Sequence, residues 1–144
     1  MVLAPHMLFG AAIGSQLSSY WLAFLFGLIS HYLVDALPHW DYLQKFEISN
    51  PNHIKKVIID LLIGSFLVLF LTWSNTDKMI IFIAVFASIL PDAINGIYIN
   101  YKNKWLRHHF LLHNKIHFFK NLSFLQGLPF TLIVIFLAIY VLLL

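Results

Sequence analysis

The residues of this chain best suited to chemistry lie close together in the sequence: His31, Asp35, His39 and Asp41. His31 and Asp35 are four residues apart, so on a helix they project from one face and can bind the same cation. Pro38 ends that helix, and His39 and Asp41 follow where the chain can turn back toward it. Nitrogen and oxygen donors beside an otherwise apolar segment are costly unless something binds them. The pattern therefore predicts a metal site.

The alternative interpretation of this run is a helix end capped by polar residues at the level of lipid headgroups. That alternative explains His39 and Asp41 well. It explains Asp35 poorly, because a carboxylate that faces acyl chains needs a partner. Two further acids, Asp60 and Asp92, lie in apolar stretches. Acids within a membrane usually face the interior of a helix bundle, so we expect both to belong to the site; the alternative is a hydrogen-bonded contact between helices.

Histidines near the two ends of the chain supply further candidate ligands. His113 and His117 are again four residues apart, the spacing by which two imidazoles on one helix bind one ion. The alternative for this pair is a contact with lipid headgroups. His6 lies near the start of an apolar segment. The chain has no cysteine, so any metal is held by nitrogen and oxygen donors, which suits zinc or another borderline-to-hard divalent ion.

The composition indicates an integral membrane protein. Of the 144 residues, 60% are apolar and only 10% are charged, and the mean hydropathy is +0.82. Soluble domains have about 25% charged residues. The length predicts a single domain over residues 1–144. Basic residues are too few and too interfacial to suggest nucleic-acid binding, and the sequence has no glycine-rich phosphate loop, Gly-x-Ser-x-Gly elbow or Cys/His nucleophile pair.

Helices must position these residues, and the hydropathy pattern predicts an all-α bundle. Long or near-long apolar stretches cover residues 20–37, 54–73, 78–99 and 123–144, with a short helix over 3–13 and an interfacial helix within 100–121. The loops that follow the first and third of these long stretches contain most basic residues, including Lys45 and Lys104, whereas the short turn before residue 79 has only Lys78. The positive-inside rule therefore predicts a multi-pass protein of the cell (inner) membrane, with the basic loops and the candidate ligands on the cytoplasmic side.

With these residues in view, the chain resembles the small membrane-bound metal-dependent hydrolases of bacteria and archaea. The matching segments are His6-Met7-Leu8-Phe9-Gly10, Leu90-Pro91-Asp92 and His113-Asn114-Lys115-Ile116-His117. The run from His31 through Asp35 to His39 is also similar to the His-x3-Asp…Pro…His segment of zinc-dependent phospholipase C and the related single-strand nucleases. The chain departs from the family pattern at Asn95-Gly96, where an acid and a histidine are expected, and in the late motif, which lacks the usual Arg and Thr-His-Ser.

The resemblance implies a membrane-embedded hydrolase that uses one to three divalent ions, zinc above all, to activate water for attack on a phosphoester. The implied substrate is a membrane lipid or a lipid-linked phosphoester. Asp35, Asp60 or Asp92 would orient the water, and Lys115 would bind the phosphate. The rival hypothesis is a non-enzymatic small membrane protein with a structural metal, or one that handles metal ions or protons. The nine candidate donors exceed the four that one structural zinc ion needs, which favours the enzyme.

Overall fold

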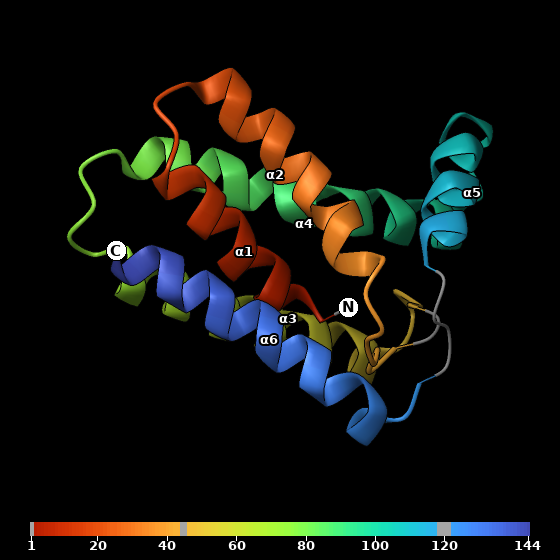
Figure 1. Cartoon of the computed structure of the whole chain (residues 1–144). Helices are drawn as coiled ribbons and strands as arrows, with labels where there is room; N and C mark the ends of the chain where they lie inside the picture. The colour runs from red at the N-terminus through yellow and green to blue at the C-terminus, as the bar shows by residue number, and fades with distance from the viewer. Residues whose placement is uncertain (1, 44–45, 118–121) are drawn as a thin grey trace.

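The structure is a computed structural model that describes residues 2–43, 46–117 and 122–144 (Figure 1). Its elements are α1 (Leu3–Ser15), α2 (Tyr20–Asp35), α3 (Pro51–Leu71), α4 (Lys78–Tyr101), the short 3-10 helix η1 (Lys104–Leu106), α5 (Arg107–Ile116) and α6 (Phe124–Leu143). No described residue forms a strand, so the predicted all-α class is confirmed. Lys45, which contributed to the predicted orientation, lies outside the described residues.

The short helix α1 forms the centre of the molecule. It contacts α2, α3, α4 and α6, and Figure 1 shows it between the other long helices. Most of its side chains are buried, including Leu8 and Ala11 at 0% exposure. Because α1 has no charged residue and is surrounded on several sides, it serves as a core helix. His6, in its first half, is consequently carried into the interior.

Glycines allow the helices around α4 to approach it closely. A Cβ atom at Gly14 of α1 would lie 2.8 Å from the Cα atom of Ile81. A Cβ atom at Gly27 of α2 would lie 2.5 Å from the carbonyl oxygen of Ala84. Real structures do not tolerate such short contacts, so a larger residue at either position would push the helices apart. Close backbone approach of this kind is a common way to pack helices in membranes.

Two helices within the described part of the chain, α4 and α6, are long and apolar enough to cross a membrane. The sequence predicted four such segments. Helices form in all four, but α2 has only 16 residues, about 24 Å at 1.5 Å per residue. The helix α3 carries Lys55, Lys56 and Asp60 in its first half. In the most apolar 18-residue stretch of α6, only 22% of the residues are buried, so most of its apolar side chains face outward rather than into a core.

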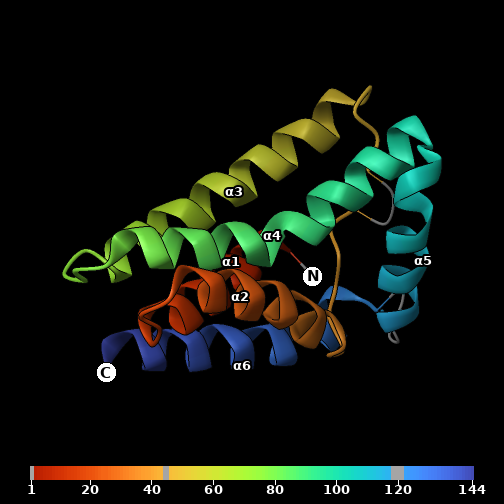
Figure 2. The same cartoon turned by 90° about the horizontal axis from the view of Figure 1, so that it is seen from above.

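A turn at the end of α4 brings α5 back toward α2. Lys102 follows α4 in the left-handed conformation (φ 53°), a common way to end a helix, and its N–H donates to the carbonyl of Tyr98. The helix η1 and then α5 follow, and α5 contacts both α4 and α2. Figure 2 shows α5 crossing the end of α4, while α3 and α4 diverge from the short loop that joins them. This arrangement positions the site.

Candidate metal centre

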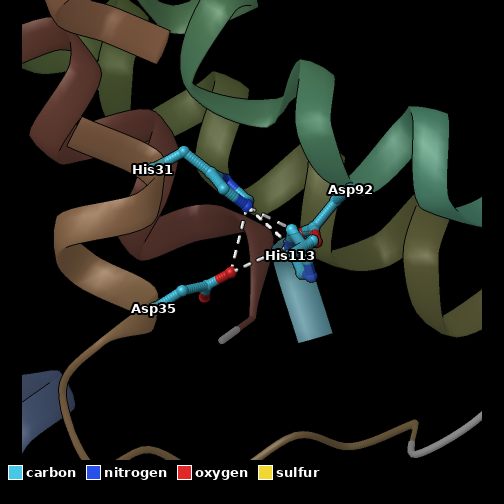
Figure 3. A group of neighbouring side chains, drawn as sticks. All are labelled: His31, Asp35, Asp92 and His113. Carbon is cyan, nitrogen blue, oxygen red and sulfur yellow. Dashed lines mark hydrogen bonds and ion pairs between the residues drawn. The ribbon is translucent and has the colours of Figure 1, made fainter. Parts of the chain in front are cut away.

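Four side chains from three helices form a compact polar group in the otherwise apolar interior: His31, Asp35, Asp92 and His113. Figure 3 shows His31 and Asp35 projecting from α2 toward Asp92 of α4 and His113 of α5. One nitrogen or oxygen donor from each residue lies within 4.8 Å of the others. His31 and Asp35 are fully buried as side chains, whereas Asp92 remains 27% exposed. A buried His/Asp group of this kind is able to hold a metal ion.

The distances between these donors match the spacing of ligands around one ion. His31 Nε2 lies 3.0 Å from Asp35 Oδ2 and 3.0 Å from His113 Nε2. His113 Nε2 lies 3.1 Å from Asp35 Oδ2 and 3.4 Å from Asp92 Oδ1. The His31 Nε2 to Asp92 Oδ1 distance is 3.7 Å. Four ligand atoms arranged tetrahedrally around zinc, each about 2.0–2.1 Å from it, are about 3.3 Å apart. These residues therefore fit a single tetrahedral ion.

A backbone contact sets the tautomer of His31 and the direction of its ring. The Nδ1–H group of His31 donates to the carbonyl of Ser88 on α4 at 2.7 Å. This hydrogen bond leaves Nε2 without a proton, so its lone pair points at the other donors. Histidine ligands of metal ions are usually held in this way by a carbonyl or carboxylate on the second ring nitrogen. The α2/α4 contact thus prepares His31 for binding.

The two carboxylate oxygens of Asp35 face different groups of histidines. Oδ2 contacts His31 and His113 as above, and it lies 2.8 Å from His117 Nε2. Oδ1 lies 3.2 Å from His6 Nε2 and 3.8 Å from His39 Nε2. Asp35, His39 and His117 form a second group of donors close enough to share an ion. Asp35 is therefore placed to bridge two neighbouring cation positions.

Unsatisfied nitrogens mark the second position. Both ring nitrogens of His6 and the Nε2 atom of His39 are buried without a hydrogen-bond partner among the described residues. His39 is oriented by its other nitrogen, because Nδ1–H donates to the carbonyl of Leu37 at 2.8 Å. Leaving buried polar atoms unpaired costs about 1–3 kcal/mol each, so such atoms in a native structure usually indicate a missing partner. A cation near Asp35 could accept a lone pair from one nitrogen of each ring.

The electrostatics favour positive charge at this site. Burial alone lowers the pKa of His113, but its contacts with the carboxylates of Asp35 and Asp92 outweigh burial and raise that pKa to about 9. Burial alone raises the pKa of Asp41, but the His39 imidazole, 3.5 Å away, helps to hold this pKa well below its usual range. Proton and metal ion are stabilised here for the same reason, namely that two or more carboxylates surround the nitrogens.

A cavity of about 670 Å³ adjoins the cluster. Its polar lining includes His39, Asp41, Asp92, His113 and His117. Its apolar lining includes Phe46, Ile48, Val57, Leu61 and Ile97. The volume is in the range of pockets that bind small organic ligands. A molecule in this cavity has direct access to Asp92, His113 and His117.

The structure brings together most of the residues that the sequence singled out and separates two from the rest. The residues gathered around Asp35 are His6, His31, His39, Asp41, Asp92, His113 and His117. Lys115, the predicted phosphate-binding residue, is exposed on α5 and is not part of the cavity lining. Its neighbours point inward because they lie two residues away on either side of it, on the opposite face of the helix.

Asp60 contacts a helix end instead of the cluster. Its Oδ2 atom accepts from the backbone N–H of Leu3 at 2.6 Å, and Oδ1 accepts from that of Ala4 at 3.1 Å. The N-cap of α1, Val2, has no side-chain oxygen to offer these amides. Asp60 therefore caps α1 from α3, which explains an acid in the middle of an apolar stretch. Through this contact it anchors the helix that carries His6.

A second polar network lies beside the cluster, and the sequence reasoning left its main members out of the site. The Tyr32 hydroxyl donates to Nε2 of His109 at 3.1 Å, and Nδ1–H of His109 donates to Asn95 Oδ1 at 3.2 Å. This chain of hydrogen bonds links α2, α5 and α4. Burial lowers the pKa of His109, consistent with a neutral ring that donates and accepts. The available sequence signal was the position of His109 one turn before His113.

No protein-family model, curated protein or solved structure matches the chain. The class that the fold and site define is an all-α protein with two apolar helices long enough to cross a membrane and a buried His/Asp cluster suited to a metal ion. Its function is inferred from this geometry.

Proposed function

We propose that the protein is a membrane-embedded, metal-dependent hydrolase of phosphoesters. The observation that carries this proposal is the cluster of His31, Asp35, Asp92 and His113, whose donors have tetrahedral spacing and adjoin a cavity. The choice of a phosphoester is supported by the resemblance of the run from His31 to His39 to zinc-dependent phospholipase C. Zinc is the ion that best suits this mixture of imidazole and carboxylate donors.

In this proposal His31, Asp35 and His113 would hold the first ion, and Asp92, the most exposed of the four donors, would act on water at the open position instead of binding the ion. Catalytic zinc sites typically use three protein ligands and leave one position open, whereas structural sites are closed. Asp92 suits the open side because its side chain is 27% exposed while that of Asp35 is 0% exposed. A second ion would be held by Asp35, His39 and His117, with His6 as a further nearby nitrogen donor.

The chemistry is the addition of water across a phosphoester bond. A bound zinc ion lowers the pKa of water toward about 7 and polarises phosphoryl oxygens. Asp92 accepts the proton of the attacking water, since its carboxylate is the exposed acid of the cluster. The water oxygen forms the new bond to phosphorus while the bond to the ester oxygen breaks, and the proton is passed to the departing alkoxide. Asp35 keeps the histidines in place throughout.

The competing function is a structural or transported ion. A structural site has a closed ligand shell, but this cluster adjoins a cavity of about 670 Å³ and has more donors than one ion requires. A transport path requires polar groups that continue across the membrane. Between Asp77 and Asp92, Ser88 is the one polar residue among the buried residues of α4, which are otherwise apolar and include Ile80, Ile81, Ala84 and Val85. These features favour hydrolysis.

We further propose that the chain is a multi-pass protein of the cell membrane with its metal centre on the cytoplasmic side. The two long apolar helices and the outward-facing apolar residues of the bundle support this, among them Trp21 (84% exposed), Phe66 (67%) and Phe136 (65%). Soluble proteins rarely leave so many large apolar side chains uncovered. The orientation rests on the distribution of lysine and arginine.

The proposal is tested by purifying the protein without chelator and assaying bis(4-nitrophenyl) phosphate and 4-nitrophenyl phosphate. We expect chelator-sensitive hydrolysis that zinc restores, and a loss of at least about 100-fold in kcat for Asp92→Asn. Asp77→Asn is the matched control because Asp77 lies at the opposite end of α4, and its activity should equal that of the parent. Metal-loaded protein that hydrolyses neither ester faster than a metal-matched blank would overturn the proposal.

A further inference from the structure

The cavity beside the metal centre extends away from it along α4. Its α4 lining includes Asp92, Gly96, Asn100 and Tyr101, one after another in the direction of the chain. At 1.5 Å per residue, the distance from Asp92 to Tyr101 is about 13 Å. Only the part of the cavity next to Asp92 belongs to the metal centre. The part that reaches Asn100 and Tyr101 lies beyond the candidate ligands.

The extended part is an apolar groove between two diverging helices. We call it the α3/α4 groove, and it is lined by Phe46, Val57, Leu61, Ala93, Gly96 and Ile97. Figure 2 shows α3 and α4 separating toward the start of α3 and the end of α4, and the helical lining residues of the groove belong to these parts of the two helices. Near it, Leu62 (63% exposed) and Tyr101 (68% exposed) continue the apolar character onto the outer surface of the molecule. The groove thus joins the metal centre to a surface that suits acyl chains.

Gly96 keeps the groove open. Among the six glycines, the other five have a Cβ position within 3.0 Å of a neighbouring atom, so helix or loop packing accounts for them. A Cβ atom at Gly96 would meet only the Phe46 ring, at ordinary contact distances of 3.5 and 3.8 Å. Glycine inside a helix lowers the stability of the helix by about 1 kcal/mol relative to alanine. Since close packing does not account for Gly96, this glycine needs a different explanation. Here the missing side chain leaves space in the groove.

Asn100 holds the wall opposite Gly96 in place. Its Nδ2 group donates to the carbonyls of Phe46 and Gly96, at 3.3 and 2.8 Å, and its Oδ1 atom accepts from the backbone N–H of Ile48 at 2.9 Å. These bonds tie the segment before α3 to α4. The groove is therefore a built feature with a fixed wall.

From these observations we infer that the substrate is a lipid phosphoester whose hydrocarbon chain lies in the α3/α4 groove while its phosphoryl group reaches the metal centre. This inference rests on the proposed function and names its substrate class. The two ends of the cavity match the two ends of such a molecule: metal ions held by the cluster would suit the anionic phosphoryl group, and apolar walls suit the chain. A small, fully water-soluble phosphoester would leave the groove empty.

The experiment measures binding, so its result is separate from that of the hydrolysis assay. The probes are n-butyl, n-octyl and n-dodecyl phosphate, titrated into zinc-loaded protein held in amphipol so that no free detergent competes. A fully buried methylene strengthens binding by about fourfold, so octyl phosphate should bind the parent at least about tenfold more tightly than butyl phosphate even with partial burial. Equal affinities for all three probes would overturn the inference while leaving the hydrolysis assay unaffected.

Two variants close the groove from opposite sides, and a third serves as control. Gly96→Phe fills it from α4, and Val57→Trp fills it from α3. In both, we expect the gain from butyl to octyl phosphate to fall below about threefold, with zinc content equal to that of the parent. Ile63→Phe adds similar bulk to α3 at a position that is 51% exposed and does not line the cavity, so this variant should keep the full gain. Chain-length dependence that persists in both groove variants would also overturn the inference.

Discussion

The Nε2 atoms of His31 in α2 and His113 in α5 lie 3.0 Å apart in a buried site, although the two residues are 82 positions apart in the sequence. The proton of His31 is on Nδ1, where it donates to the Ser88 carbonyl, so His31 presents a bare lone pair toward His113. At this distance the lone pair accepts either an N–H group of His113, whose pKa the neighbouring carboxylates raise, or a metal ion, and Asp35 and Asp92 surround that position.

Asp35 should be essential for metal binding. Asp35→Asn keeps the shape of the side chain but removes the anionic oxygen that contacts His31, His113 and His117. We expect bound zinc to fall from at least one equivalent per chain to less than about 0.2, because loss of a metal ligand costs more than the 10–100-fold typical of outer partners. Asp41→Asn is the control and should lose less. Undiminished zinc in Asp35→Asn would exclude it as a ligand.

Removing the metal should destabilise the parent protein. An ion that binds only the folded state adds about 4 kcal/mol when its free concentration is 1,000 times the Kd. Thermal unfolding in detergent, with and without chelator, should therefore show a midpoint lower by several degrees in the chelated protein. The Asp35→Asn variant should unfold at the same temperature in both conditions. A parent midpoint that does not respond to chelator contradicts a tightly held ion.

Asp60 should contribute to stability and leave metal content unchanged. Asp60→Ala removes both acceptors of the Leu3 and Ala4 amides, and hydrogen bonds to charged groups are worth about 1.5–3 kcal/mol. Asp60→Asn retains one carbonyl oxygen and should lose about half as much. Urea unfolding and zinc analysis of the same samples check both statements. Zinc loss in Asp60→Asn as large as in Asp35→Asn would assign Asp60 to the metal centre instead.

Tyr32 and His109 should be energetically coupled. Tyr32→Phe removes the hydroxyl that donates to His109 Nε2, and His109→Phe removes its acceptor. A double-mutant cycle should give a coupling free energy of about 1 kcal/mol, the usual value for a partly buried neutral hydrogen bond. Zinc content should stay at the level of the parent in all three variants, because neither residue belongs to the two groups of candidate donors. Strictly additive losses would show that the hydrogen bond contributes nothing.

The orientation in the membrane can be read with single cysteines, since the chain has none. We expect Asn75→Cys, in the turn between α3 and α4, to react with a membrane-impermeant thiol reagent on intact cells. Lys104→Cys, in η1, should react only after the membrane is made permeable. The reverse labelling pattern would invert the orientation and place the metal centre outside the cytoplasm.

The sequence by itself determined the helical class and the local groupings of ligands. Spacing along one helix decides which side chains share a face, so the pairing of His31 with Asp35 and of His113 with His117 was predictable without a structure. Of the four predicted spans, the described residues give two helices long and apolar enough to cross a membrane, because α2 is short and α3 carries charges near its start.

Only the tertiary structure decided the different roles of Asp60 and Asp92. Both are single acids among aliphatic residues, so hydropathy treats them alike. Asp92 joins the cluster because α2 and α5 both pack on its part of α4, and Asp60 binds the amides at the start of α1 because α1 packs on α3. Which helix faces a given side chain depends on contacts between residues far apart in the chain, and local periodicity carries no information about those contacts.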